Sequence, residues 1–236
     1  MNTPITTAMI RRTENSPARP PRERDILRLL TWLSPAFPTG GYAYSHGLES
    51  AVERCDVTNG ETLRAWLADV LAHGAGRNDA ILLRHAHRAA ADPAALADLS
   101  ELGAAATPCR ERQAETINQG AAFILAATPW GTPPLPERVP YPVAVGAMAG
   151  RHGIDEYSAA TGYLQALAGN LISAAVRLVP LGQSAGLAVL AALEPDILAI
   201  AAATRDATLD DLGGCAFRSD LAAMRHETQY TRLFRS

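Results

Sequence analysis

The last thirteen residues, 224–236, hold the densest group of side chains suited to recognising another protein. Wound as a helix, this C-terminal segment would place His226, Tyr230 and Phe234 on one side at i, i+4 and i+8, beside an arginine-rich polar edge. Arginine and tyrosine often anchor interfaces, because each joins a large contact area to directional hydrogen bonds. The segment is therefore predicted to be a partner-binding helix, and the alternative is a solvated helix that frays.

A second candidate lies between the first two predicted helices, in residues 34–49, called here the glycine loop. Gly40 and Gly41 permit positive φ or a close backbone approach, and Tyr42 and Tyr44 flank them. Phosphate binding is disfavoured, because all 21 basic residues are arginine and no strand pattern precedes the glycines. The chain therefore has neither a phosphate-loop lysine nor a Schiff-base lysine. A turn that packs its tyrosines is the simpler interpretation.

No metal site or catalytic centre is predicted. His85 and His87 are two residues apart on a predicted helix, so they point about 200° apart and share a metal only with help from another element. His226 and Glu227 are adjacent and face different ways, which does not indicate an acid–base pair. The three cysteines form no Cys-x-x-Cys pair, so a reducing, cytoplasmic location without a thiolate zinc site is expected.

The length and charge of the chain limit the class of protein that it can be. With 236 residues, 48% of them hydrophobic, the chain can bury one large core. A net charge of −3 gives no global attraction for nucleic acid or acidic membranes, which counts against a helical transcription regulator. Residues 157–176 carry no charged side chain but are only weakly apolar, so they are predicted to be a buried helix rather than a membrane span.

The remaining pattern is helical throughout, with no alternating strand pattern. Ile26, Leu29 and Leu33 mark one face of a first helix, and small residues such as Gly146, Gly150, Gly162 and Gly169 indicate closely packed helices. Start signals occur at Thr58 to Glu61, Asn78-Asp79, Asp92-Pro93 and Thr107-Pro108, and later helices are predicted at 143–151, 156–179, 184–193 and 196–204. The sequence predicts an all-α, single-domain bundle of roughly eight to ten helices.

Two stretches together resemble the urease accessory protein F (UreF) family. They are the glycine loop, with Ser-Pro-x-x-Pro-x-Gly-Gly and Ser-His-Gly-Leu-Glu, and the C-terminal segment, Met-Arg-His-Glu-Thr-Gln-Tyr-Thr-Arg-Leu-Phe-Arg-Ser. Residues 141–146, 170–183 and 209–212 also resemble family landmarks in family order. The resemblance covers roughly residues 25–236. The Pro- and Arg-rich residues 1–24 resemble no landmark and are predicted to be disordered.

The resemblance implies a non-enzymatic, cofactor-free, usually dimeric helical scaffold in urease maturation. It would bridge the accessory protein UreD (also called UreH) and the GTPase UreG, and so help deliver nickel to apo-urease. It also implies a docking segment at residues 217–236 of a helical domain spanning 25–236. The partner contacts expected from it in the C-terminal segment are Arg225, His226, Tyr230, Arg232, Leu233, Phe234 and Arg235. Weaker assignments, to a partner or to the dimer contact, are Gly40, Gly41, Tyr44 and Ser45.

A stand-alone helical enzyme or ligand-binding bundle is the alternative. It would use the Gly40-Gly41 loop and a histidine, and it predicts a concave pocket with convergent polar groups.

Overall fold

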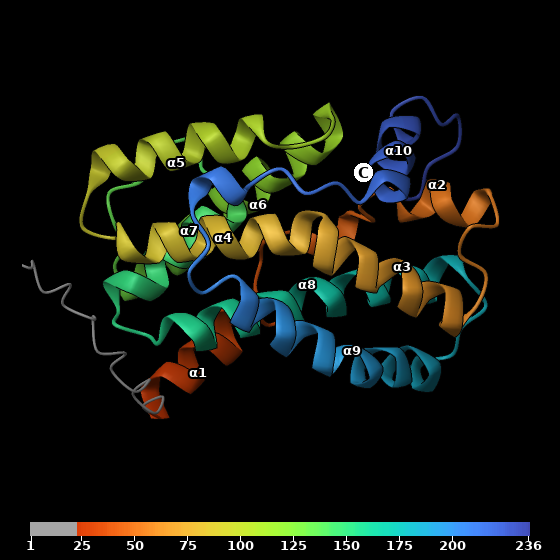
Figure 1. Ribbon diagram of the computed structural model, residues 1–236, viewed down its shortest axis with the longest axis horizontal. Helices are drawn as coiled ribbons and strands as arrows, with labels where there is room; N and C mark the ends of the chain where they lie inside the picture. Colours follow the sequence, from red (N-terminus) through yellow and green to blue (C-terminus); the bar gives the residue numbers. More distant parts are fainter. Residues whose placement is uncertain (1–22) are drawn as a thin grey trace, which may run out of the picture.

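The computed structural model describes residues 23–236, and this part of the chain is all-helical with no strand (Figure 1). It has ten α-helices, within the predicted range, and three short 3-10 helices. The α-helices are α1 (Glu23–Trp32), α2 (Leu48–Glu53), α3 (Gly60–His73), α4 (Ala75–Arg88), α5 (Pro93–Ala105), α6 (Arg110–Ala127), α7 (Tyr141–Arg151), α8 (Glu156–Leu178), α9 (Gln183–Ala203) and α10 (Phe217–His226). The 3-10 helices are η1 (Gly41–Ala43), η2 (Thr128–Trp130) and η3 (Leu209–Asp211).

The expected disordered stretch 1–24 lies mostly outside the described residues. Its last two members, Glu23 and Arg24, form the start of α1, so disorder is not correct for these two.

The helix starts follow local capping chemistry, although one predicted cap is displaced by one residue. The Asp92 carboxylate accepts hydrogen bonds from the amides of Ala94 and Ala95 and begins α5, as predicted. The predicted capping box from Thr58 to Glu61 is wrong by one residue. The Asn59 side chain caps α3 by accepting a hydrogen bond from the Thr62 amide, and the Thr62 hydroxyl accepts one from the Asn59 amide. The cap can shift to Asn59 because Asn is as good a cap as Thr.

The other helix boundaries differ more. The helix predicted from Asn78-Asp79 begins earlier, at Ala75, and the one predicted from Thr107-Pro108 begins at Arg110. The two helices predicted at 184–193 and 196–204 are one helix, α9, which continues through Pro195. Pro195 is exposed, while Leu193 and Ile197 on either side of it are buried, so core packing holds the helix together across the missing backbone hydrogen bond.

The core consists of two hydrophobic clusters. Helices α3 and α4 run along the middle of the bundle, with α8 and α9 on one side and α5 and α6 on the other (Figure 1). One cluster joins α2, α3, α8 and α9 and includes Phe234, near the end of the chain. The other joins α1, α4, α5, α6, α7 and the first half of α8 around Trp32 and Phe123.

Helices α4 and α7 approach each other through glycine. A Cβ atom on Gly146 would lie 2.1 Å from the Leu83 carbonyl oxygen, and one on Gly150 would lie 2.1 Å from the His87 carbonyl oxygen. The close packing predicted from these two glycines is therefore confirmed. Gly169 in α8 differs, because its added Cβ would have no atom within 4 Å.

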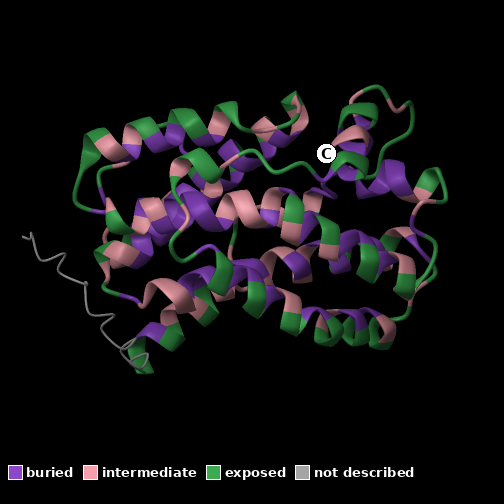
Figure 2. Cartoon of the chain, viewed as in Figure 1, coloured by how far each residue is buried: buried purple, intermediate pink, exposed green. Residues whose placement is uncertain are grey.

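Helix α9 leaves much of its apolar surface uncovered. It is the one helix in residues 23–236 that is long and apolar enough to cross a membrane by composition, and 28% of that apolar window is buried. Leu187 and Leu198 are exposed on it, together with several alanines (Figure 2). The stretch 157–176, which raised the membrane question in the sequence, lies in α8, with Leu164, Leu171 and Ala175 buried.

Candidate functional site

The C-terminal segment is not the continuous helix that its sequence predicts. Helix α10 ends at His226, and the remaining ten residues, 227–236, are turns and irregular backbone. His226 and Phe234 are buried within the chain, whereas Tyr230 is fully exposed. The predicted shared face of these three side chains is therefore wrong. The physical reason is that backbone amides of the segment bond to distant side chains instead of to the preceding helical turn.

Glu49 supplies the most important of these distant bonds. It stands in the first turn of α2, as the last residue of the glycine loop, and it is buried. Its carboxylate accepts hydrogen bonds from the amides of Leu233 (2.7 Å) and Phe234 (2.9 Å). The same carboxylate lies 3.2 Å from Nε2 of His226. One side chain of the glycine loop thus holds the C-terminal segment at both ends of its irregular part.

Glu111, at the start of α6, is the second carboxylate. Its Oε2 lies 2.6 Å from Nδ1 of His226, and its Oε1 accepts a 2.6 Å hydrogen bond from Arg232. The backbone amide of Glu111 donates to the Glu227 carboxylate, 3.1 Å away. The His226 ring is therefore held between two carboxylates, and it is 0% exposed.

The final residues are seated on the glycine loop. The amide and hydroxyl of Ser45 both donate to the Ser236 carbonyl oxygen, at 2.8 and 2.5 Å. The Ser236 hydroxyl donates to Glu115 at 2.5 Å, and the Arg235 amide donates to the Ala43 carbonyl at 2.9 Å. The glycine loop and the C-terminal segment, 191 residues apart at Ser45 and Ser236, are therefore bonded directly to each other.

Phe234 anchors this end of the segment in the core. Its ring belongs to the cluster between α2, α3, α8 and α9, and the Arg177 guanidinium lies 4.3 Å from the ring centroid. Arg177 also donates to the Tyr42 carbonyl oxygen at 2.8 Å. The anchor therefore ties α8, the glycine loop and the C-terminal segment together.

The turn that aims Glu49 needs a special backbone. His46 has φ 62° and Gly47 has φ 77°, so two successive residues are left-handed. A Cβ on Gly47 would lie 2.5 Å from the backbone nitrogen of Ala223 in α10. Only glycine fits there, because both the conformation and the contact with α10 exclude a side chain.

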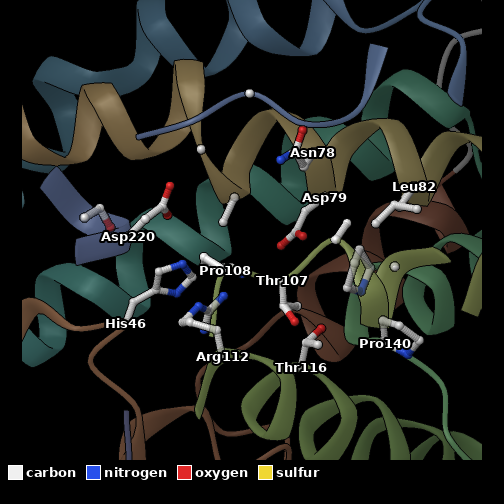
Figure 3. Close-up of a pocket in the computed structure, with 17 residues that line it drawn as sticks. His46, Asn78, Asp79, Leu82, Thr107, Pro108, Arg112, Thr116, Pro140 and Asp220 are labelled. Carbon is white, nitrogen blue, oxygen red and sulfur yellow. The ribbon is translucent and has the colours of Figure 1, made fainter. Parts of the chain in front are cut away.

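A polar cavity of about 80 Å³ lies beside the glycine loop, with His46 in its lining. Figure 3 shows Asp79 from α4 and Arg112 and Thr116 from α6 around it, with His46 beside Arg112. A second cavity, of about 170 Å³, shares Asp79, Arg112 and Thr116 with the first and is also lined by Gly41. The convergent polar groups expected of a ligand-binding bundle are thus present next to the glycine loop.

The charges around the cavities perturb one another. Burial raises the pKa of Asp79 to about 6, although a hydrogen bond from Tyr163 opposes the shift. Burial and the Arg112 guanidinium lower the pKa of His46, which favours its neutral form. Burial alone would raise the pKa of Glu115, but Arg112 and His46 together outweigh burial and lower it.

Replacing Asp79 by Asn tests this balance. The pKa of Asp79 is raised from 3.8 to about 6 in the folded chain. The ionised carboxyl therefore lowers the free energy of unfolding above about pH 6, whereas below pH 3.8 the group is protonated in both states and has no effect. We expect Asp79→Asn to raise the free energy of unfolding by about 1–2 kcal/mol at about pH 7.5 and to have little effect at about pH 4. Urea unfolding at both pH values measures it. An equal gain at both would contradict the assigned cause.

Comparison with known proteins gives a consistent result. A family model described as UreF matches residues 57–194, more than half of the chain. The chain is 53% identical over 220 residues to the urease accessory protein UreF of Methylobacterium sp. (strain 4-46), covering 89% of this chain and 88% of that protein. The chain belongs to the UreF family. It is also 51% identical over 220 residues to UreF of Bradyrhizobium sp. (strain BTAi1), covering 89% and 92%, and 48% identical over 234 residues to UreF of Rhodopseudomonas palustris (strain BisB5), covering 95% and 96%.

The UreF landmarks in this chain divide by exposure. The exposed members of the predicted contact set are Arg225, Tyr230, Arg232, Leu233 and Arg235. The buried members are His226, Phe234, Tyr44 and Ser45, while Gly40 and Gly41 are half-buried. The buried side chains hold the C-terminal segment and the glycine loop in place, and the exposed ones lie at the surface, with Arg232 also paired to Glu111.

Three residues of this site were not among the predicted contacts. Glu49 closes the Ser-His-Gly-Leu-Glu landmark, but nothing in its sequence context indicates that it accepts bonds from the other end of the chain. Glu111 and Glu115 lie four residues apart on α6, and with Arg112 and Gln119 they make a polar helical face. That polar spacing was the available signal for a buried ionic site, since Arg112, Glu115 and Gln119 are all buried.

Three histidines of this UreF chain, His85, His87 and His152, contact backbone carbonyl oxygens. His85 and His87 contact the carbonyl oxygens of Ala207 (3.1 Å) and Ile154 (2.7 Å). Within residues 23–236, no group of three or more His, Cys, Asp or Glu residues is placed to hold a metal ion.

Proposed function

We propose that this chain acts in urease maturation as a non-enzymatic, cytoplasmic scaffold. It would bridge a UreD (UreH)-type accessory protein and a UreG-type GTPase during nickel insertion into apo-urease. Family membership supports the link to urease. The observation that carries the contact surface is the C-terminal segment, which is fixed to the glycine loop by buried bonds and presents a row of exposed arginine, tyrosine and leucine side chains.

The chemistry of that exposed face suits a protein partner. Tyr230 and Leu233 are exposed beside Arg225 and Arg235, so apolar area and arginine fork donors occur together. The backbone beneath them is already held by Glu49, which reduces the ordering cost when a partner binds. We assign this face to the UreD-type partner.

The GTPase role belongs to another protein in this proposal. The chain contains no lysine, so it cannot supply the lysine of a phosphate loop. Any contact that it makes with the GTPase through a basic side chain uses arginine.

Single substitutions on the exposed face test the proposal. We expect Leu233→Ala to weaken binding of the UreD-type partner by about 2 kcal/mol, or roughly 30-fold in Kd, because an interface anchor is lost. Titration calorimetry with the purified partner measures the change. The matched control is Leu125→Ala at the far end of α6, since Leu125 is 75% exposed and Leu233 is 65% exposed.

The control distinguishes a local effect from a general one. The proposal requires that Leu125→Ala leave the Kd unchanged. If Leu233→Ala also leaves it unchanged, the C-terminal segment is only a structural element and the assignment of the partner face fails.

A homodimer is the second part of the proposal, and we assign it to the exposed face of α9. This face is apolar and rich in alanine, which lets two copies of the helix approach closely around a twofold axis. We expect Leu187→Glu to convert the dimer to a monomer at micromolar concentration. Light scattering measures the mass, with Leu125→Glu as the control on another exposed leucine. A monomeric wild-type chain, or a dimer that survives Leu187→Glu, would refute this part.

The cavity beside Gly41 is the observation that favours the alternative, a ligand-binding or enzymatic bundle. GTP hydrolysis by the rigorously purified chain, without any GTPase, would support that alternative.

A further inference from the structure

The buried environment of His226 sets a condition on how the C-terminal segment docks. One ring nitrogen lies 3.2 Å from a Glu49 oxygen, and the other lies 2.6 Å from a Glu111 oxygen. An ionised carboxylate only accepts hydrogen bonds, so both ring nitrogens must donate. A neutral imidazole has a single N–H group, whereas the imidazolium has two. With both carboxylates ionised, the arrangement is satisfied only when His226 is doubly protonated.

We propose that Glu49 is the positioning residue for the partner-binding face, and that it acts together with His226 in its doubly protonated form. This inference rests on the proposed function, because the face that it positions is the one assigned to the UreD-type partner. The hydrogen bonds of the Glu49 carboxylate go to backbone amides and to His226 rather than to the exposed contact side chains. It acts through the amides of Leu233 and Phe234, which fix the direction of the exposed side chains around them.

The charges around His226 balance when the ring is charged. Helix α2 contributes Glu49, α6 contributes Glu111, and the C-terminal segment contributes Arg232, which shares Glu111. The adjacent Arg225 and Glu227 add one charge of each sign, and Glu227 is engaged by the Glu111 amide. Two carboxylates therefore face two cations. Loss of one ring proton removes the hydrogen bond that the ring donates to one of the two carboxylates, which weakens docking.

Docking is favoured while both ring nitrogens donate, so a rise in pH that removes one ring proton weakens docking. The groups nearer the cavities, Asp79 and His46, face Arg112 and Glu115 rather than His226. The Asp79→Asn variant separates the contribution of Asp79 from that of His226.

The first experiment measures backbone amide exchange at Leu233 and Phe234 in the full chain without any partner. We expect Glu49→Gln to speed exchange at these amides by about tenfold or more, because bonds to a charged acceptor are lost. The matched control, Glu53→Gln, alters an exposed glutamate on the same short helix and should leave the rates unchanged. Unchanged rates in Glu49→Gln would overturn the proposal.

The second experiment is a pH profile of the same exchange between about pH 6 and about pH 8.5. Wild type should lose protection as pH rises. Glu49→Gln should show a flatter profile, because its amide can donate to a neutral His226 ring and the second ring proton is no longer needed. A variant profile as steep as the wild-type profile would contradict the role assigned to Glu49.

A spectroscopic measurement on the wild type does not depend on any variant folding. Nitrogen chemical shifts of His226 at about pH 6 should report protons on both ring nitrogens. A neutral tautomer in the docked chain would overturn the proposal. The Kd of Glu49→Gln for the UreD-type partner then separates the positioning role of Glu49 from the partner assignment. Faster exchange with an unchanged Kd would keep Glu49 as the residue that positions the segment but refute the assignment of this face to the partner.

Discussion

A chain that ends at Gln229 is expected to lose detectable binding to the UreD-type partner while it keeps its helices. The removed residues, 230–236, contain no helix but hold most of the exposed contact side chains and the Phe234 anchor. Several interface anchors are lost together, so an affinity loss of about 4 kcal/mol or more, roughly 1000-fold, is expected. Co-purification with the partner, together with circular dichroism of the truncated chain, measures both parts.

A triple alanine variant provides the matched comparison for that truncation. Tyr230, Leu233 and Arg235 are exposed, and replacing all three leaves the Glu49 bonds to the backbone intact. It should lose binding as the truncation does. Loss in the truncation alone would mean that the segment supports the fold instead of meeting the partner.

Gly146→Ala is expected to be the most destabilising single methyl addition among the changes considered. Its Cβ would lie 2.1 Å from the Leu83 carbonyl oxygen, a backbone atom that cannot rotate away. Helices α4 and α7 would have to separate, which costs about 3 kcal/mol or more of unfolding free energy. Urea unfolding measures this, and thermal unfolding should show a clear fall in Tm.

Gly169→Ala is the matched control for that substitution. It lies on α8, and its added Cβ meets no atom within 4 Å. Alanine is the better helix former, so this variant should be unchanged or gain up to about 1 kcal/mol. Equal destabilisation by both variants would show that the contact between α4 and α7 is not the cause.

The sequence predicts most of the fold because its signals are local. The Asp92-Pro93 start acts within one turn of α5 and is confirmed, as is the close packing predicted from the glycines of α7. The errors arise where tertiary packing overrides a local rule. Pro195 predicts a break, yet the buried Leu193 and Ile197 keep α9 continuous.

The candidate site was predictable only in part, for a related reason. The sequence points to both the glycine loop and the C-terminal segment, but helical periodicity gives the latter the wrong conformation. Its bonds go to Glu49, which is 184 residues before Leu233. A carboxylate that distant leaves no local pattern, and neither does the placement of Glu111 beside His226.

Hydroxyl-radical footprinting of the chain, free and bound to the UreD-type partner, tests the central claim most directly. Tyr230 and Leu233 are exposed in the free chain, so both should be oxidised readily, and Leu125 serves as an internal reference. In the complex, the account predicts strong protection of Tyr230 and Leu233 with Leu125 unchanged. Oxidation of Tyr230 and Leu233 at the free-chain rate in a fully formed complex would contradict it.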